Sequence, residues 1–314
     1  LAAMVKPVLL LHGGAGTWKA PRSRVEKAIK AIRDAAEHGY RYLATGSSIE
    51  AVVESIAYME DSQAFNAGTG SVLNVLGERE MDAGIMDGLT GKAGAVAAVK
   101  YPRNPIRLAR IVMEKTGHVV LAGEGADRLA KKVGLKEIPP VPEEIKKRYS
   151  ELIGKYSRGE LGYFKNNIPL LKEIGWLDTV GAVAIDSNRR LVAGVSTGGV
   201  WLKLPGRVGD SPVPGAGFYA DKDIAVAATG IGEAMLLTMP GLRIALLVKQ
   251  GYGFKYSMDI VLNYITSTIG EGTTGIIGID KEGRHHISFN TRHILVSYKS
   301  PDTIWAKLME RKTS

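Results

Sequence analysis

The segment Thr179-Val180-Gly181-Ala182-Val183-Ala184-Ile185 decides the fold, because it begins an apolar hairpin where a long connector ends. A second apolar run, residues 191–196, follows after Asp186-Ser187-Asn188-Arg189-Arg190, whose Asp, Ser and Asn suit a turn. Both runs are apolar at successive positions rather than at alternate ones. Strands of this kind are covered on both faces, so the pattern predicts a hairpin in the middle of a layered structure.

The stretch before this hairpin, about 140–178, is expected to be an exposed connector with little core of its own. Prolines occupy positions 139, 140 and 142, a charged helix runs through Tyr156, and a polar stretch continues to Asn167. The connector ends at Asp178, directly before the apolar strand.

Helices and strand pairs are expected on both sides of the connector. Residues 7–11 form a buried strand that ends at His12, and the helix that follows is expected to use Ser23 as its N-cap. Further helices are predicted over 48–59, 105–115, 124–133, 232–249 and 255–267, a strand over 93–99, and a second hairpin over 275–280 and 284–289.

Composition excludes several classes of protein. The chain has 314 residues, 45% of them hydrophobic, so it can bury a full core as one large domain or two ordinary ones. The absence of cysteine excludes disulfides, thiolate zinc sites and a cysteine nucleophile. No apolar run is long enough to span a membrane and no signal peptide is evident, so a cytoplasmic protein is expected.

The formal charge of +9 does not indicate nucleic-acid binding, because the basic residues are dispersed. The one tight cluster, Lys146-Lys147-Arg148, lies beside Glu143 and Glu144 and reads as a solvated helix face. Glutamine occurs only at Gln63 and Gln250, which favours a thermostable protein.

Thr179 is a candidate nucleophile. Without cysteine, covalent catalysis requires Ser, Thr, Lys or a carboxylate, and an alcohol needs a nearby base. An α-amino group, with a pKa of about 7.7 to 8.0, is such a base. A threonine at a new N-terminus would carry nucleophile and base on one residue. The simpler interpretation, which the local sequence favours, is that Thr179 merely begins a strand. The six histidines match no catalytic or metal motif and read as structural or solvated.

Arg207 and Asp210 could recognise the head group of an amino acid. They lie three residues apart in the turn Leu204-Pro205-Gly206-Arg207-Val208-Gly209-Asp210. A guanidinium binds a carboxylate through two hydrogen bonds, and a carboxylate can accept from an ammonium group. A surface salt bridge in a tight turn is the alternative.

Two glycine-containing segments could bind anions. The first leads into a predicted helix and consists of Ala228-Thr229-Gly230-Ile231-Gly232. The backbone amides at the start of that helix could bind an oxyanion. Alternatively, the segment is a turn whose backbone conformation requires glycine. His12-Gly13-Gly14-Ala15-Gly16 would suit a nucleotide-binding regulator, but Lys19 replaces the third glycine of the dinucleotide fingerprint.

Together these residues carry a family resemblance. The chain resembles the plant-type L-asparaginases, or isoaspartyl aminopeptidases, of the N-terminal nucleophile hydrolases. The matching segments span nearly the whole chain: His12-Gly13-Gly14-Ala15-Gly16, Phe65-Asn66-Ala67-Gly68, Met81-Asp82-Ala83, Met86-Asp87-Gly88, Ala93-Gly94-Ala95-Val96, Thr179-Val180-Gly181-Ala182-Val183, Ser196-Thr197-Gly198-Gly199, the 206–212 turn and Thr229-Gly230.

The resemblance implies an α+β fold, the four-layer α-β-β-α sandwich, formed by a single domain over 1–314. It implies a precursor that cleaves itself between Asp178 and Thr179 into fragments 1–178 and 179–314, which stay associated and assemble as a dimer of such pairs.

The resemblance also assigns roles to residues. Thr179 is the nucleophile, Thr197 supports it, Asn66 orients groups nearby, and Thr229 with Gly230 forms the oxyanion hole. Arg207 binds the substrate α-carboxylate, and Asp210 with Gly232 binds the α-ammonium. No cofactor is implied for catalysis. A structural sodium ion is implied in a loop of backbone carbonyls from Met59, Glu60, Ser62, Phe65, Ala67 and Thr69, which suit a hard cation.

Two departures from the family pattern keep the substrate open. Many relatives have glycine before the nucleophile, whereas this chain has Asp178. In this respect it resembles the glycosylasparaginase and taspase branches. Val200-Trp201-Leu202 replaces the usual Met-Thr-Asn-like stretch and is expected to reshape the pocket rim. Asparagine and β-aspartyl dipeptides are the expected substrates, with a glycosylasparaginase-like or taspase-like hydrolase as the alternative.

Overall fold

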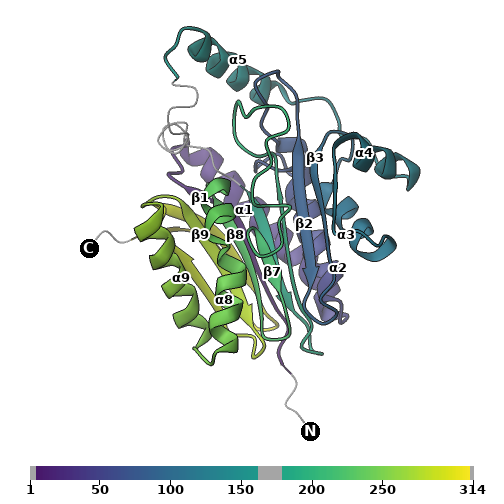
Figure 1. Ribbon diagram of the computed structural model, residues 1–314, viewed down its shortest axis with the longest axis vertical. Helices are drawn as coiled ribbons and strands as arrows, with labels where there is room; N and C mark the ends of the chain where they lie inside the picture. Colours follow the sequence, from purple (N-terminus) through teal and green to yellow (C-terminus); the bar gives the residue numbers. More distant parts are fainter. Residues whose placement is uncertain (1–4, 162–178, 312–314) are drawn as a thin grey trace.

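Two β-sheets organise the protein, a mixed α/β structure seen in the computed structural model (Figure 1), which describes residues 5–161 and 179–311. The larger sheet has the strand order β12-β11-β1-β5-β6-β2-β3-β4, and the smaller sheet has the order β10-β9-β8-β7. The strands of the larger sheet are β1 (Val8–Gly16), β2 (Met81–Asp87), β3 (Ala93–Val99), β4 (Val120–Ala122), β5 (Val180–Ile185), β6 (Leu191–Thr197), β11 (His293–Lys299) and β12 (Ile304–Glu310). Those of the smaller sheet are β7 (Phe218–Ala220), β8 (Ile224–Gly230), β9 (Thr274–Asp280) and β10 (His285–Phe289).

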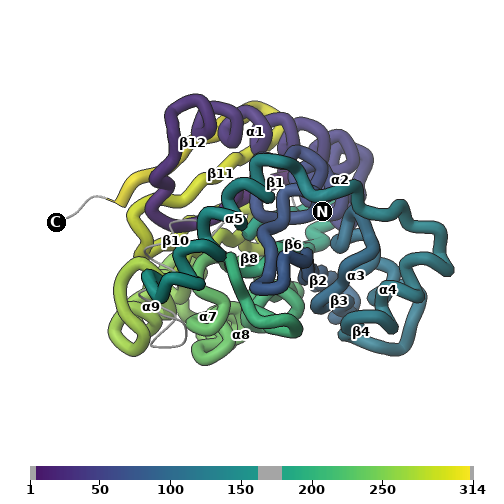
Figure 2. Tube along the Cα trace, turned by 90° about the horizontal axis from the view of Figure 1, so that it is seen from above, coloured from purple at the N-terminus to yellow at the C-terminus, as the bar shows by residue number. Residues whose placement is uncertain are grey.

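Helices lie on the outer faces of the two sheets, except the helix over 143–157, which packs against residues 72–73 and 201–202. They are α1 (Arg22–Ala44), α2 (Ser48–Asp61), α3 (Pro105–Lys115), α4 (Gly123–Lys132), α5 (Glu143–Ser157), α7 (Gly232–Thr238), α8 (Pro240–Lys249) and α9 (Phe254–Thr268), with a 3-10 turn η1 (Gly68–Gly70). Figure 2 shows α1 and α2 on the side of the molecule opposite α7 and α8, with strands between them. None of the helices in the described ranges is long and apolar enough to cross a membrane.

The central hairpin is confirmed. Strands β5 and β6 pair antiparallel, with Val180 opposite Ser196 and Ile185 opposite Leu191. Strand β1 flanks β5 and strand β2 flanks β6, so neither hairpin strand is at an edge. Every residue of both strands is buried, as the unbroken apolar runs predict.

Three hydrophobic clusters explain why polar residues do not alternate with apolar ones along the central strands. One cluster lies between α1, α2, α3 and the larger sheet, one between the two sheets, and one between the smaller sheet, α8 and α9. Leu9 and Leu11 belong to the first cluster, whereas Leu10 between them belongs to the second. Because successive side chains of a strand point to opposite faces, a strand with a core on each side must be apolar throughout.

Several predicted boundaries were wrong, each for a local reason. Helix α1 begins at Arg22 after Pro21, whose ψ of 147° is extended, so Ser23 lies inside the first turn and is not the N-cap. The expected helix over 232–249 is two helices, because Met239 adopts a left-handed conformation (φ 47°) before Pro240. Strand β1 does not end at His12 but continues through a bulge to Gly16.

Part of the connector lies in the described residues. Helix α5 is largely exposed, as expected, but Leu152 is buried. It packs in a small cluster with Val72, Leu73, Trp201 and Leu202, so the connector is not without a core. The predicted cleavage residue Asp178 lies outside the described residues.

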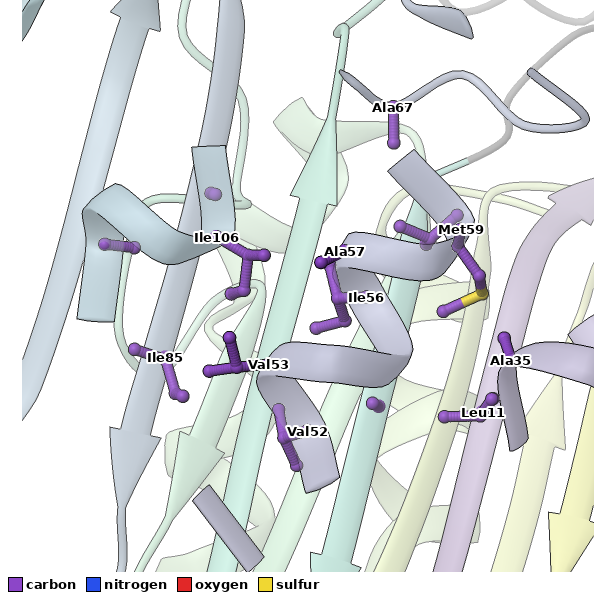
Figure 3. Close-up of a cluster of buried hydrophobic side chains, with 14 of the residues drawn as sticks. Leu11, Ala35, Val52, Val53, Ile56, Ala57, Met59, Ala67, Ile85 and Ile106 are labelled. Atoms are coloured by element: carbon purple, nitrogen blue, oxygen red, sulfur yellow. The ribbon is translucent and has the colours of Figure 1, made fainter. Parts of the chain in front are cut away.

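Helix α2 provides a test of the core between the helices and the larger sheet. Ile56 of α2 is fully buried there (Figure 3). We expect Ile56→Ala to lower the free energy of unfolding by about 2–5 kcal/mol, because it removes buried methyl groups and leaves a cavity. Leu237→Ala, at a side chain that is 75% exposed, is the control and should change it by less than about 0.5 kcal/mol. Urea unfolding followed by circular dichroism measures both, and equal losses would contradict this assignment of the core.

Candidate active site

The central hairpin brings two threonine hydroxyls together. Thr179 directly precedes β5 and is 8% exposed. Its Oγ1 donates a hydrogen bond of 3.2 Å to Oγ1 of Thr197, the last residue of β6. The Thr197 hydroxyl also accepts from the backbone N of Gly199 at 3.0 Å. Strand pairing therefore fixes the predicted nucleophile beside the residue predicted to support it.

Asn66 fixes the turn that follows Thr197. Its Nδ2 donates to the carbonyl of Gly199 at 2.7 Å, and its Oδ1 accepts from the backbone N of Val72 at 3.0 Å. The Asn66 carbonyl accepts from the backbone N of Gly198. A Cβ at position 198 would lie 2.4 Å from Asn66 Oδ1, so only glycine fits there. The predicted site residues Thr179, Thr197 and Asn66 thus form one connected group.

A second group contains the residues predicted to bind the substrate head group. Arg207 donates from Nε and Nη2 to the two carboxylate oxygens of Glu233, at 3.0 and 2.8 Å. Burial opposes the charged form of Arg207, but the Glu233 carboxylate outweighs it and raises the Arg207 pKa. Sequence reasoning missed Glu233, because it follows Gly232 at the start of α7, far from the 204–210 turn.

Asp210 lies in the same group. It is 4% exposed, and burial raises its pKa to about 7, against the opposing effect of Arg207. Across the described ranges, its Oδ2 has no hydrogen-bond partner. A Cβ at Gly232 would lie 2.8 Å from Arg207 Nη2 and 3.0 Å from Asp210 Oδ1. Gly232 therefore packs directly against both side chains. The buried Oδ2 of Asp210 remains able to accept a hydrogen bond.

Thr229 and Gly230 end strand β8 of the smaller sheet, which packs against β5 and β6. Thr229 Oγ1 is buried and has no partner among residues 5–161 and 179–311. Gly230 has a φ of +126°, and a Cβ there would lie 2.1 Å from the carbonyl of Thr273. This glycine is thus a steric requirement. Within the described chain, no hydrogen bond joins these two residues to Thr179 or Thr197.

Strand β2 and the residue before it carry buried acidic groups that sequence reasoning did not assign. The Glu80 carboxylate accepts from the backbone N of Gly206, the residue before Arg207, at 3.1 and 3.2 Å. Lys203 Nζ donates to the Glu80 carbonyl at 2.6 Å. Burial raises the pKa of Asp82, and Lys203 opposes that change. In the sequence, the segment Met81-Asp82-Ala83 was noted as a match to the family, but no role was predicted for its acidic residue.

His12 is fully buried next to β5, in agreement with a structural histidine. It pairs with Gly181 across β1 and β5, and a Cβ at Gly181 would lie 2.2 Å from His12 Nε2. Burial lowers the His12 pKa to about 3, so the ring is neutral at physiological pH.

The loop predicted to hold sodium folds back onto the end of α2. Thr69 Oγ1 donates to the Glu60 carbonyl at 2.8 Å, and Ser62 Oγ donates to the Met59 carbonyl at 2.8 Å. Gly68, at φ +53°, packs against Glu60. Each carbonyl oxygen has two lone pairs. The Met59 carbonyl also accepts from the backbone N of Ser62 at 3.3 Å, so the bonds found within residues 5–161 and 179–311 leave an acceptor site on the Glu60 carbonyl but none on that of Met59. In the described ranges, no group of three or more acidic or histidine side chains is arranged to hold a metal ion.

Substitutions at Glu80 and Glu78 test whether the Glu80 carboxylate stabilises the turn that contains Arg207. Glu80→Ala removes the buried acceptor of the Gly206 amide and should lower the free energy of unfolding by about 1–3 kcal/mol. Glu78, two residues earlier, makes an exposed ion pair with Lys100, and Glu78→Ala should lower it by less than about 1 kcal/mol. Denaturant unfolding distinguishes them, and a loss at Glu78 as large as that at Glu80 would refute this assignment.

Comparison with known proteins identifies the family. The sequence model described as "Asparaginase" matches residues 5–308. The chain is 43% identical over 303 residues to "Plant-type L-asparaginase" of Pyrobaculum calidifontis, covering 96% of this chain and 99% of the relative. It is 40% identical to "Isoaspartyl peptidase/L-asparaginase" of Danio rerio, covering 91% and 89%.

A bacterial relative is named only as a peptidase. The chain is 39% identical to "Isoaspartyl peptidase" of Salmonella typhimurium, over 92% of this chain and 93% of that protein. These similarities extend over nearly the whole chain and confirm the resemblance drawn from its motifs. The chain belongs to the asparaginase family.

Proposed function

We propose that this protein is a threonine-dependent amidohydrolase that cleaves itself before Thr179 and then hydrolyses the side-chain amide of L-asparagine and the isopeptide bond of β-aspartyl dipeptides. The observation that carries the proposal is the buried Thr179 hydroxyl, 3.2 Å from Thr197 Oγ1 at the start of the central hairpin. Family membership and the names of the relatives from Pyrobaculum calidifontis and Salmonella typhimurium support it.

Maturation begins with the Thr179 hydroxyl. Its oxygen attacks the carbonyl carbon of Asp178, and the peptide nitrogen leaves as an amine that gains the hydroxyl proton, so that the acyl group moves from nitrogen to oxygen as an ester. Water then hydrolyses the ester, which releases the Asp178 carboxylate and leaves a free α-amino group on Thr179. The products are residues 1–178 and 179–314.

Strand pairing supports continued association of the two fragments. Strands β1 and β2 belong to the first fragment, and β5, β6 and β11 belong to the second. The pairs β1–β5, β1–β11 and β2–β6 join the fragments within one sheet. The order of helices, larger sheet, smaller sheet and helices supports the four-layer α-β-β-α sandwich. The dimer of such fragment pairs is part of the same proposal.

In the mature enzyme, Thr179 acts as both nucleophile and base. Its α-amine accepts the hydroxyl proton while Oγ1 attacks the amide carbon of the substrate. The Thr229 hydroxyl and the Gly230 amide stabilise the negative oxygen that forms. Ammonia or an amino acid leaves with a proton, and water hydrolyses the acyl-enzyme ester to release aspartate. Thr197 holds the Thr179 hydroxyl, and Asn66 holds the turn behind Thr197.

The second group of residues selects the substrate. Arg207 binds the α-carboxylate through its guanidinium, and Glu233 fixes the orientation of that guanidinium. Asp210, with its open Oδ2, binds the α-ammonium beside Gly232. A free amino-acid head group satisfies both charges, which favours asparagine and β-aspartyl dipeptides over a protein loop.

A sodium ion is part of the proposal for the 59–69 loop. The backbone carbonyls of Met59, Glu60, Ser62, Phe65, Ala67 and Thr69 would hold it, since carbonyl oxygens are hard ligands. The ion would stabilise the loop that leads to Asn66. Catalysis itself is proposed to need no cofactor.

Removing the nucleophile tests the central step. Thr179→Ala should leave one uncleaved chain on a denaturing gel and release no ammonia from asparagine, because the variant lacks the attacking oxygen. Circular dichroism should show an unchanged fold. An uncleaved variant that remains active would sink the proposal, as would active wild-type protein without a fragment that begins at Thr179.

The raised pKa of Asp210 predicts a pH dependence of binding. Below its pKa of about 7 the carboxyl is neutral and cannot offset the substrate ammonium. We therefore expect KM for asparagine to be about tenfold higher at pH 6 than at pH 8, since only the ionised fraction binds. Asp210→Asn should raise KM and abolish this dependence. Initial rates of ammonia release across the pH range measure KM, and an unchanged pH profile in the variant would exclude this role.

A further inference from the structure

Two buried side chains of opposite charge, Asp82 and Lys203, have no part in the proposed mechanism. Asp82 lies on β2 and is fully buried, and Lys203 follows β6 and is 4% exposed. Burying charged groups costs stability, and apolar residues of similar volume often stabilise a core at least as well. Buried charges that lie close to reacting groups are therefore candidates for a functional role.

Asp82 lies between the strand that carries Thr197 and the turn that carries Arg207. In the pairing of β2 with β6, Asp82 is directly opposite Thr197, so both side chains point to the same face of the sheet. That face is turned toward the smaller sheet, because the adjacent Ala83 belongs to the cluster on the helix side. Burial raises the pKa of Asp82, and Arg207 and the backbone amide of Gly209 are among the groups that oppose this change. Asp82 thus interacts with both groups of predicted site residues.

The carboxylate of Asp82 is only partly satisfied by hydrogen bonds. Its Oδ1 accepts from the backbone N of Ala98 at 2.8 Å. Its Oδ2 is buried and has no hydrogen-bond partner within 5–161 and 179–311. Lys203 is the group that most strongly opposes the effect of burial on the Asp82 pKa. No ion pair in the described part of the chain joins the two, so the Lys203 ammonium acts on the carboxylate through its field, which is strong in a buried environment.

The Lys203 side chain lies against the turn that follows Thr197. Its Nζ donates to the Glu80 carbonyl at 2.6 Å. A Cβ at Gly199 would lie 2.8 Å from that Nζ, so the ammonium packs directly on Gly199. The backbone N of Gly199 donates to Thr197 Oγ1 at 3.0 Å, and Thr197 Oγ1 accepts from Thr179 at 3.2 Å. Lys203 therefore packs on the residue that holds the supporting hydroxyl.

We propose that Asp82 and Lys203 are positioning residues, whose opposite charges fix the turn after Thr197 relative to the turn that carries Arg207. This inference rests on the proposed function and adds two residues to it. The attacking oxygen belongs to the first turn's neighbourhood and the bound head group to the second. Their separation decides where the amide carbon of the substrate lies, and small displacements there reduce rates strongly. Neither Asp82 nor Lys203 needs to touch the substrate.

The experiment measures kcat and KM for asparagine with the self-cleaved enzyme, normalised to the fraction of chains that carry the fragment beginning at Thr179. Asp82→Asn keeps the size of the side chain and the acceptor for the Ala98 amide, but it removes the charge. We expect kcat to fall about ten- to a hundredfold, the effect of displacing reacting atoms by up to about 1 Å. KM should change little, because Arg207 and Asp210 still bind the head group.

The double variant Asp82→Asn/Lys203→Met tests whether the two residues act as a pair. Each single variant leaves one buried charge without its strongest opposite charge. The double variant leaves neither charge, so its kcat should be no lower than that of the less active single variant. Such non-additivity is expected of coupled groups and not of independent ones.

Asp87 and Arg190 provide the matched control, at the other end of β2. The Arg190 guanidinium donates to the two carboxylate oxygens of Asp87 at 2.9 and 2.8 Å, and Asp87 is also buried. Asp87→Asn should lower the midpoint of urea unfolding but leave kcat and KM for asparagine unchanged. A role in stability alone would give the same result at Asp82.

Loss of self-cleavage in Asp82→Asn but not in Asp87→Asn would support the proposal, because the Thr179 hydroxyl also makes the first attack. The proposal is overturned if Asp82→Asn keeps the wild-type kcat, if Asp87→Asn loses as much, or if the losses of the single variants multiply in the double variant. Should the single variants not fold, the double variant decides: a loss of about tenfold or more supports the proposal, and a wild-type kcat overturns it. Failure of the proposed function would appear differently, as no ammonia release from asparagine by the unsubstituted enzyme.

Discussion

The pairing of β5 with β1 and β6 is the constraint on which the rest of the structure depends. Strand β5 has a hydrophobic cluster on each face and a hydrogen-bonded strand on each side. Thr179 directly precedes this strand, is buried, and is hydrogen-bonded to Thr197 at the end of β6, so the sheet sets the position of its hydroxyl. A reactive group needs this kind of support, because small displacements reduce rates strongly.

Buried charges around Arg207 are held by partners from other segments. Glu233 comes from α7, Glu80 lies just before β2, and Lys203 comes from the chain that follows β6. Glu80 and Lys203 are buried, and leaving a buried charge without its partner costs on the order of 3–5 kcal/mol. Glu233 is partly exposed, so solvent reduces the corresponding cost there. The proposed head-group site is therefore stable only when these segments meet, which ties substrate recognition to completion of the fold.

Local patterns in the sequence were sufficient for some of these features and not for others. The hairpin follows from apolar runs and a short turn, and the limits of α3 follow from helical periodicity with Pro105 in the first turn. The place of Thr197 beside Thr179 was implied only by the family resemblance. Strands β11 and β12 form a local hairpin that was not predicted from the sequence. The partners Glu233 and Glu80 could not be predicted, because contacts between distant segments leave no local pattern. Met239 shows a smaller failure: helical periodicity continues across it, but Pro240 forces the backbone out of the helix.

Because strand pairs join the two proposed fragments, the cleaved protein is expected to unfold differently from the precursor. A precursor unfolds as one molecule, whereas a cut protein whose halves share a sheet unfolds into two molecules. Refolding then becomes a second-order encounter, and the apparent melting temperature rises with protein concentration. Once separated, each half exposes the unpaired edges of central strands, which favour aggregation. The lifetime of the cut form would therefore be governed by how slowly the sheet opens rather than by an equilibrium.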